Sequence, residues 1–361
     1  MKIEGSILTP DGWRAGEIHL GATIEAIEGA PTDAPRAPHI LPGFVDLHNH
    51  GGGGADMMEG EQALRRAVRT HARHGTTALA ATSVTAPDAQ TEAFLDAVAA
   101  VMQRPEPQGA RVLGAHLEGP FINPGKLGAQ PPHARDPDIA QIEAWAARAR
   151  VIIMTFAPEI DADGALMDAL DRLGIKAQMG HSLCDHACAR AGFARGAGAT
   201  HLFNAMSGIS HRGNGLAGAA LAHADWAEII PDLIHVEAGA ILAARRAIPN
   251  LYGVTDATAG AGMPDGTYHL GGQTVTRAQG AMRLPDGTLA GSALVMDRAL
   301  RNLVSIGLPL AEASRRLSTL PADWIGAADC GRLRPGARAD LAIFDGELAL
   351  IRTVIGGAEI G

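Results

Sequence analysis

The sequence predicts an α/β protein whose central part is a (β/α)8 TIM-like barrel. Eight short apolar segments, each a candidate strand, occur in order between residues 43 and 257. Alanine-rich amphipathic stretches with scattered Arg and Glu residues separate most of these segments. Strands that alternate with helices form parallel sheets, and eight such strands are the number that closes a barrel of this kind.

The candidate strands and helices follow one another along the chain. The strands are GFVDLH (43–48), TTALAATS (76–83), RVLGAHLE (111–118), VIIMTFAP (151–158), IKAQMGH (175–181), GATHLFN (198–204), AEIIPDLIHV (227–236) and NLYGVTDA (250–257). The clearest helices are EQALRRAVRTHARHG (61–75), TEAFLDAVAAVMQ (91–103), CDHACARAGFARG (184–196) and AILAARRAIP (240–249). Apolar strands between amphipathic helices are typical of a parallel sheet that the helices cover.

The two ends of the chain differ from this pattern. Residues 1 to about 40 and the tail from about 331 are short β segments separated by Gly and Pro, without helical periodicity. We therefore expect both ends to form one small sheet domain, with residues 1–42 and 330–361 flanking a barrel of residues 43–329. The stretch 262–291 contains two Asp-Gly turn signals and predicts a β-ribbon before a helix that starts near Ser292.

Composition narrows the classes of function. The chain has 361 residues, 47% of them hydrophobic, so it can bury a sizeable core. Its net charge of −9 and its lack of basic runs argue against nucleic acids and anionic membranes as partners. It has no run of about 18 apolar residues and no signal-peptide pattern, which predicts a cytoplasmic protein that acts on small molecules. Its three cysteines are too few for a disulfide framework, so we expect them to be reduced and structural.

Residues that can bind a metal occur at the ends of several predicted strands. They are His48 and His50 after the first strand, Glu118 at the third, His181 at the fifth, His201 in the sixth and Asp256 at the eighth. Active sites of (β/α)8 barrels lie at the carboxyl ends of the strands, so these side chains are expected to meet there. Glu118, His181 and His201 would give three ligands and an open position, the arrangement of a catalytic zinc site.

The motif His48-Asn49-His50 is followed by four glycines, residues 51–54. Residues i and i+2 of a strand point to one face, so the two imidazoles would converge. The glycines are expected to leave room for a ligand, because a backbone without side chains allows close approach. Asp46, two residues before His48, is expected to support the site without binding the metal.

Seven segments occur in one order along essentially the whole chain: PGFVDLHNHG, HLEGPFINP, GHS, THLFNAMSG, GLAGAAL, VTDAT and GRLRPGARADLAIFD. In them the chain resembles the amidohydrolase superfamily and, within it, the N-acetylglucosamine-6-phosphate deacetylases. The resemblance implies that the small domain is a β-sandwich and that the enzyme is a homodimer. It also implies a zinc-dependent hydrolysis of the N-acetyl group of a 6-phosphorylated amino sugar.

The resemblance implies roles for single residues. Glu118, His181 and His201 match the family's zinc ligands, and Asp256 matches its catalytic acid and base. The residues that match substrate-binding positions are Asn204, Ala205 through its backbone N–H, Arg212, His235, Leu289, Ala290 and Gly291. Arg212 matches an arginine that pairs with the phosphate, for which a guanidinium is well suited. Arg212 or His235 is expected to reach into the site of the neighbouring subunit.

One residue departs from the family pattern. Gln130 stands where the family has a histidine that binds the substrate and polarises its amide carbonyl. A Gln amide can donate a hydrogen bond but cannot become a cation, and His133 could replace it only if the loop is displaced. Family members that keep both histidines of the His-x-His motif can hold two metals. We expect a second metal at His48 and His50, bridged to the first by Glu118, to supply the missing polarisation.

Other functions fit the sequence less well. A hydantoinase or dihydroorotase would carry a carboxylated, metal-bridging lysine at the fourth strand, where this chain has VIIMTFAPE without Lys. A nucleobase deaminase needs neither the glutamate of HLEGP nor a phosphate-facing Arg212. A metal-free scaffold that has lost catalysis would not need Glu118, His181, His201 and Asp256. Because Gln130 departs from the family pattern, a catalytically weakened homologue remains an alternative. The gluco or galacto preference stays open, with N-acetylgalactosamine 6-phosphate as the alternative substrate.

Overall fold

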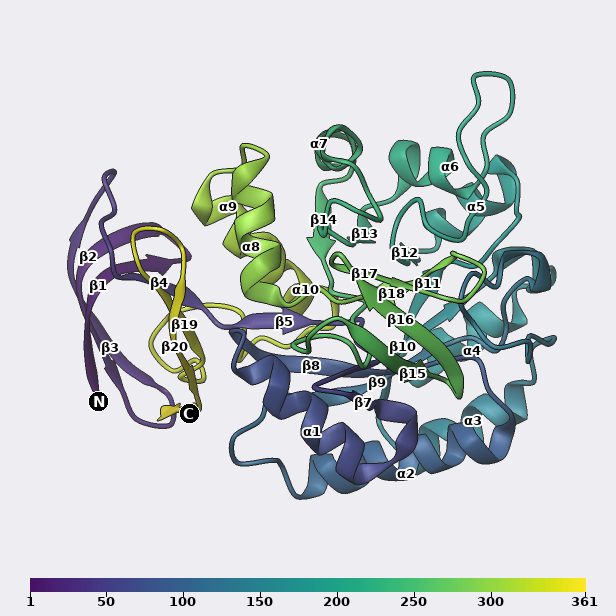
Figure 1. The fold of residues 1–361 in the computed structure, drawn as a ribbon. Coiled ribbons are helices and arrows are strands. Elements are labelled where there is room, and N and C mark those ends of the chain that lie inside the picture. Colours follow the sequence, from purple (N-terminus) through teal and green to yellow (C-terminus); the bar gives the residue numbers. More distant parts are fainter.

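Eight parallel strands form one sheet in the computed structural model, which describes residues 1–361. Along the sheet the order is β14-β13-β12-β11-β10-β9-β8-β5. The strands are β5 Phe44–Asp46, β8 Thr76–Ser83, β9 Arg111–Glu118, β10 Val151–Phe156, β11 Lys176–Met179, β12 Gly198–Ala199, β13 Trp226–Ile229 and β14 Asn250–Gly253. Each lies within or overlaps one predicted segment, so the eight predicted strands and the fold class are confirmed (Figure 1).

Helices connect the successive strands and cover the outside of the barrel (Figure 1). The α-helices are α1 Glu61–Ala72, α2 Asp88–Gln103, α3 Ile139–Arg148, α4 Ala165–Leu173, α5 His186–Ala194, α6 Leu216–His223, α7 Ala238–Ala247, α8 Met296–Ser305, α9 Leu310–Leu317 and α10 Thr319–Trp324. Short 3-10 helices are η1 Met57–Glu59, η2 Pro124–Lys126 and η3 Pro158–Ile160. The four predicted helices are confirmed as α1, α2, α5 and α7. A continuous core of 73 buried apolar residues fills the barrel and the space between the barrel and its helices. This core is separate from the core of the terminal sheet.

The sheet closes just beyond the carboxyl ends of its first and last strands. The N–H of His50 donates to the carbonyl of Ala257 at 2.8 Å, and the N–H of Asp256 donates to the carbonyl of His48 at 2.9 Å. Asn49 and Ala257 also form a parallel bridge. These backbone bonds place two histidines and one aspartate, which are far apart in sequence, side by side at one end of the barrel.

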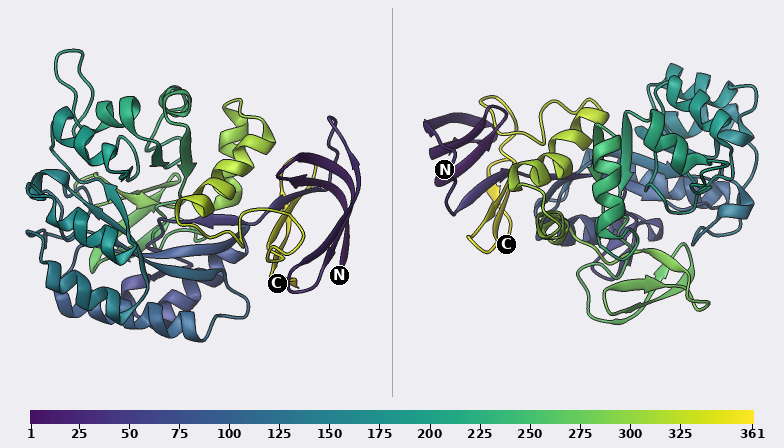
Figure 2. Two further views of the ribbon diagram at one scale, coloured as in Figure 1. Left: turned by 180° about the vertical axis from the view of Figure 1, so that it is seen from behind. Right: turned by 90° about the horizontal axis from the view of Figure 1, so that it is seen from above.

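Both ends of the chain contribute to a second sheet of seven strands, as predicted (Figure 2). Its order is β21-β20-β19-β4-β1-β2-β3. The strands are β1 Lys2–Thr9, β2 Gly12–Leu20, β3 Ile24–Pro31, β4 His39–Pro42, β19 Leu341–Phe344, β20 Leu350–Ile355 and β21 Ala358–Glu359. This sheet has a core of its own, formed by twelve buried residues from both ends of the chain. Burial of apolar side chains between the faces of the curved sheet stabilises a small sandwich-like domain. The division of the chain after residues 42 and 329 stays a prediction.

A four-stranded antiparallel ribbon follows the last barrel strand, as the turn signals predicted, and Figure 2 shows it projecting from the barrel. Its strands are β15 Gly266–Leu270, β16 Gln273–Ala278, β17 Ala281–Arg283 and β18 Leu289–Ser292. The helix expected near Ser292 begins at Met296, because Ser292 still belongs to β18. The N–H of Ser292 donates to the carbonyl of Asp256 at 2.7 Å, so the ribbon is attached directly to the end of the last barrel strand.

Two further features of the structure concern the cysteines and the helices. Cys184, Cys188 and Cys330 are all free thiols, and two of them are buried. None of the helices combines the length and the apolar character that a membrane crossing requires.

Candidate active site and metal centre

The carboxyl ends of the barrel strands deliver the predicted site residues to one cavity. Glu118 is the last residue of β9, whereas His181, His201 and Asp256 each follow the end of a strand by two or three residues. These last three adopt positive φ angles of 47°, 26° and 48°. Such backbone conformations cost about 1–3 kcal/mol for a non-glycine residue and persist only where the surroundings hold them. The three strained residues therefore indicate a functional site at the ends of the strands.

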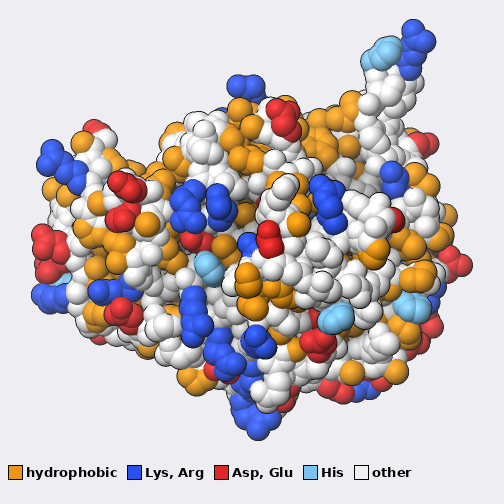
Figure 3. All heavy atoms as spheres, in the orientation of Figure 1, with side chains coloured by type: hydrophobic (Ala, Val, Ile, Leu, Met, Phe, Trp, Pro, Cys, Tyr) orange, Lys and Arg blue, Asp and Glu red, His pale blue; other side chains and the backbone are white.

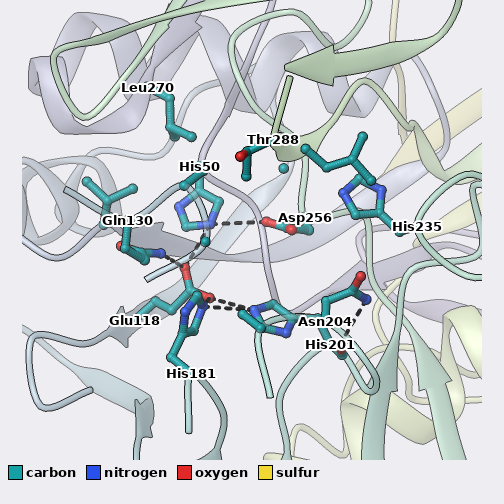
Figure 4. A pocket seen from close by; sticks show the side chains of 16 residues that line it. His50, Glu118, Gln130, His181, His201, Asn204, His235, Asp256, Leu270 and Thr288 are labelled. Atoms are coloured by element: carbon teal, nitrogen blue, oxygen red, sulfur yellow. Dashed lines mark hydrogen bonds and ion pairs between the residues drawn. The ribbon is translucent and has the colours of Figure 1, made fainter. Parts of the chain in front are cut away.

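One group of ligand atoms surrounds Glu118 Oε1. His181 Nε2 and His201 Nε2 each lie 3.0 Å from this oxygen and 3.1 Å from each other (Figure 4). All three residues are buried. A carboxylate oxygen and two neutral imidazole nitrogens that face one another can each direct a lone pair at one shared cation. The donor set of one carboxylate and two imidazoles therefore fits a divalent metal, with zinc among the metals that such ligands bind.

A second group lies directly beside the first. His48 Nε2 and His50 Nε2 are 3.2 Å apart and lie 3.5 Å and 3.2 Å from Asp256 Oδ1. Glu118 Oε1 is 3.4 Å from His48 Nε2, and Glu118 Oε2 is 3.2 Å from His50 Nε2. Glu118 thus stands between the two groups with one oxygen toward each imidazole of the second. This geometry can hold a second cation that shares Glu118 with the first.

The electrostatics of the cluster favour positive charge. Burial opposes protonation of His50, but Asp256 and Glu118 raise its pKa to about 9. Burial likewise opposes protonation of His48, yet Glu118, Glu228 and Asp256 raise its pKa well above the usual range. Burial alone would raise the pKa of the Asp256 carboxyl, but His48 and His50 lower it. Buried carboxylates without Lys or Arg partners attract cations, so the charges also fit a metal centre.

Two buried carboxylates support the cluster without lining the cavity. Asp46 accepts hydrogen bonds from Thr255 Oγ1 at 2.6 Å, from the N–H of Thr255 at 3.1 Å and from Asn49 Nδ2 at 2.9 Å. It contacts no imidazole, which agrees with the supporting role expected from the sequence. Glu228 accepts from His48 Nδ1 at 2.9 Å. The sequence analysis missed Glu228, although a glutamate inside an otherwise apolar strand is a signal that could have identified it.

Gln130 reaches the cluster, whereas His133 does not. Gln130 is 8% exposed, accepts the N–H of Thr85 through Oε1 at 2.6 Å and donates through Nε2 to Glu118 Oε2. His133 is exposed and does not line the cavity. It therefore does not take the place of the family's histidine in this structure.

The cavity above the cluster has a volume of about 250 Å³. The predicted residues that line it are His50, Glu118, Gln130, His181, His201, Asn204, Ala205, His235, Asp256, Leu289 and Gly291 (Figure 4). Five further residues, which the sequence analysis did not select, complete the wall: Val84, Gly128, Ala129, Leu270 and Thr288. Leu270 and Thr288 come from the ribbon, so the ribbon covers one side of the cavity.

Three of the predicted site residues lie outside the lining. His48 is fully buried beneath the cavity, with its Nε2 still in the metal group. Ala290 packs into a small apolar core of the ribbon, because strand alternation turns it away from the face that Leu289 and Gly291 present. Arg212 is exposed on the loop that connects β12 to α6 (Figure 1). No arginine of the chain lines the cavity.

The four glycines after His50 have a structural purpose that differs from the one expected. They form a small hairpin of β6 (Gly51–Gly52) and β7 (Ala55–Asp56), and none of them lines the cavity. A Cβ at Gly51 would lie 2.3 Å from the carbonyl oxygen of Ala55, and one at Gly53 would lie 2.2 Å from Thr70 Oγ1. Gly53 also has a φ of +64°. The glycines therefore allow the hairpin to pack against α1, and they do not make room for a ligand.

Comparisons with known proteins agree on the family. Residues 39–359 match the Amidohydrolase family. An N-acetylgalactosamine-6-phosphate deacetylase of Escherichia coli O157:H7 is 36% identical over 95% of this chain and 94% of its own. An N-acetylglucosamine-6-phosphate deacetylase of Vibrio furnissii is 35% identical over 93% of this chain and 88% of its own.

Solved structures give the same result. A mutant of the N-acetyl-D-glucosamine-6-phosphate deacetylase of Mycobacterium smegmatis, in complex with N-acetyl-D-glucosamine 6-phosphate, superposes with a TM-score of 0.92 at 31% identity. The match covers 100% of this chain and 99% of the other. The N-acetylglucosamine-6-phosphate deacetylase of Thermotoga maritima has a TM-score of 0.90 at 29% identity, with the same coverage.

Proposed function

Because the chain belongs to the amidohydrolase family, we propose that it hydrolyses the N-acetyl group of N-acetylglucosamine 6-phosphate to glucosamine 6-phosphate and acetate. The observation that carries this proposal is the meeting of Glu118, His181, His201 and Asp256 at the carboxyl end of the barrel, around one cavity. Relatives that share about a third of their residues with this chain along nearly its whole length are deacetylases of phosphorylated amino sugars.

Glu118, His181 and His201 would hold the first metal, for which we propose zinc. His48 and His50, together with Glu118, would hold a second. A divalent cation in this position polarises an amide carbonyl and lowers the pKa of a nearby water.

Asp256 is the residue that we assign to proton transfer. It lines the cavity, and the two histidines beside it lower the pKa of its carboxyl, so it is ionised at neutral pH. The ionised carboxylate accepts a proton from the attacking water and then delivers that proton to the sugar nitrogen as the C–N bond breaks. One carboxyl group thus serves as base in the first step and as acid in the second.

Asn204, Ala205 and His235 are the residues that we assign to the sugar phosphate within one chain. Ala205 has a φ of +48°, and its N–H has no acceptor in the chain. A free N–H at the cavity wall is a suitable donor for a phosphate oxygen. His235 lines the same cavity, and its pKa is raised, against the effect of burial, by the hydrogen bond from Nδ1 to Asp232. A cationic imidazole there would attract the phosphate.

We propose a homodimer in which Arg212 completes the phosphate site of the other subunit. Residues 208–214 are all exposed, and their loop extends well beyond the barrel (Figure 1). His211 and Arg212 are the only His and Arg of this loop, and Figure 3 shows side chains of these two kinds at its tip. Since no arginine lines the cavity of the same chain, we infer that a second copy supplies the guanidinium that pairs with the phosphate.

The galacto epimer is a second candidate substrate, because the Escherichia coli relative acts, by its name, on N-acetylgalactosamine 6-phosphate. The test is release of acetate from both phosphorylated sugars by the purified, metal-loaded protein, with unphosphorylated N-acetylglucosamine as control. We expect turnover of at least one phosphorylated sugar and a kcat/KM about 100-fold lower without the phosphate. Absence of acetate from both sugars would reject the function.

A charged sugar phosphate does not cross a bilayer unaided, so we propose a cytoplasmic location.

A further inference from the structure

Glu228 is a buried carboxylate directly beneath the candidate metal centre. It lies in β13 (Trp226–Ile229) and has no exposed surface. Its Oε2 atom accepts from Nδ1 of His48 at 2.9 Å and from the backbone N–H of His201 at 3.1 Å. The single oxygen therefore connects one histidine from each of the two ligand groups.

The contact with His48 decides which ring nitrogen faces the cluster. A neutral imidazole, the form that binds a metal, keeps its lone pair on Nε2 when it donates from Nδ1. Nε2 of His48 points into the cluster, 3.2 Å from His50 Nε2 and 3.4 Å from Glu118 Oε1. The carboxylate of Glu228 thus favours the tautomer that can bind a cation, and it holds the ring in the plane that directs Nε2 there.

The other candidate ligands have no comparable partner. Nδ1 of His50 and Nδ1 of His201 are buried without a hydrogen-bond partner, and Nδ1 of His181 donates to the carbonyl of Lys126 at 2.8 Å. His48 is thus the only one of the four whose distal nitrogen contacts a carboxylate. Asp256, which lies beside His48 and His50, donates its backbone N–H to the carbonyl of His48, so the two residues are placed together.

We propose that Glu228 is a positioning residue for the second metal site, which it builds by fixing His48. It also ties that site to the first through the main chain of His201. This inference rests on the metal centre of the proposed function, but it is tested by metal binding, so it can fail while the deacetylase activity stands. Carboxylate partners of metal-binding histidines typically change metal affinity about 10–100-fold when they are lost.

Two substitutions separate the charge of Glu228 from its hydrogen bonds. Glu228→Gln keeps the shape and an oxygen that can accept both N–H groups but removes the negative charge, whereas Glu228→Leu removes the acceptor. The measurements are metal content per chain and the rate at which a chelator withdraws each metal. We expect two metals in the wild type, a second metal that is withdrawn about 10-fold faster from the Gln variant, and one metal in the Leu variant.

Tyr252→Phe is the matched control. The Tyr252 hydroxyl lies 3.4 Å from the other oxygen of Glu228, but it donates mainly to Gln178 Oε1 at 2.7 Å. Gln178 keeps a second donor, Trp324 Nε1 at 2.8 Å, when the hydroxyl is removed. This variant alters the same buried layer without touching the His48 contact, and we expect it to keep both metals with wild-type release rates.

A measurement on the wild type keeps the proposal testable if the Leu variant does not fold. Nuclear magnetic resonance of ¹⁵N-histidine in the zinc-loaded protein, with His48 assigned by its absence from a His48→Asn variant, reports which nitrogen carries the proton. We expect Nδ1–H and a zinc-bound Nε2. A His48 with its proton on Nε2, a wild type that holds one metal, or Gln and Leu variants with two metals and unchanged release would each overturn the proposal.

Discussion

The side-chain oxygen of Gln130 accepts the backbone N–H of Thr85 at 2.6 Å, and this contact fixes the orientation of the whole amide. The Nε2 group is thereby turned to Glu118, to which it donates. At most one N–H of the amide is left for a substrate carbonyl, and a neutral amide is a weaker polarising group than a cation. We therefore expect another source of polarisation, and His50 of the second ligand group lies 3.2 Å, through Nε2, from the same oxygen of Glu118.

The double substitution His48→Asn with His50→Asn is expected to halve the metal content and to lower kcat sharply. Loss of a preorganised electrostatic stabiliser costs about 10²–10³ in kcat. Metal analysis and steady-state acetate release measure the two effects on the same preparation. A double variant with the metal content and rate of the wild type would show that the two histidines bind nothing that the reaction needs.

Adding Gln130→His to the double variant is expected to restore part of the rate. An imidazole donor and a second metal would be alternative solutions to the same electrostatic problem at the substrate carbonyl. The same Gln130→His change in the otherwise unaltered enzyme should have the smaller effect on kcat. Equal effects in both backgrounds would contradict the compensation and indicate that Gln130 acts independently of His48 and His50.

Asp256→Asn is expected to lower kcat by about 10²–10⁴ while the fold and the metal at Glu118, His181 and His201 remain. The substitution keeps the shape of the side chain but removes the proton acceptor. Thermal unfolding and metal analysis establish that the protein is otherwise intact. Asp286→Asn, in the exposed turn of the ribbon, is the control for loss of a nearby negative charge outside the cavity. Activity within about tenfold of the wild type would reject the role of Asp256.

Local rules predicted much of the site from the sequence. Glu118, His181, His201 and Asp256 could be placed together because parallel strands of a barrel present their carboxyl ends on one side. The same rule could not identify Glu228, because the segment 227–236 was interpreted as one continuous strand. In such a strand Glu228 lies near the amino end, away from the expected site. In the structure β13 ends at Ile229, and Glu228 lies inside the barrel beneath the cluster.

Tertiary contacts account for the interpretations that were wrong or incomplete. The glycines after His50 are required by the approach of the hairpin to α1, which no local pattern of the sequence reveals. Ala290 faces the ribbon core because β18 alternates, and the limits of β18 were not known from the sequence. The surroundings of Arg212 cannot be predicted from one chain if the contact that matters belongs to a second copy.

His71 is expected to make the protein less stable as the pH falls. It is fully buried, its Nε2 lies 2.9 Å from the carbonyl oxygen of Gly51, and burial lowers its pKa to about 4. An unfolded histidine has a pKa of about 6.5, so between these values the unfolded chain binds a proton that the folded chain does not. The contribution is therefore fully present above pH 6.5, and the free energy of unfolding falls by up to about 1.4 kcal/mol per pH unit as the pH decreases toward 4.

Denaturant unfolding of the wild type and of His71→Gln, measured at several pH values, isolates this contribution. The other titrating groups are common to both proteins, so the difference between the two curves reports His71 alone. We expect the variant to be less stable at pH 7 because a buried contact is altered, and the gap to narrow as the pH falls below 6.5. A gap that stays constant between pH 7 and pH 4.5 would show that His71 is not held neutral.

Arg212 is expected to act on the cavity of the other subunit. Arg212→Ala should lower kcat/KM for the phosphorylated sugar by about 100-fold, because a charge-assisted contact with the phosphate is lost. Arg315→Ala, which removes an exposed arginine far from the cavity, is the control.

The decisive measurement mixes and reassociates Arg212→Ala and Asp256→Asn subunits, each nearly inactive alone. A mixed dimer contains one site with an intact Asp256 and an intact Arg212 from the partner, so a statistical mixture should regain about a quarter of wild-type activity. If Arg212 served its own subunit, no site in the mixture would be complete. Activity that stays at the level of the two parents would therefore reject the shared site.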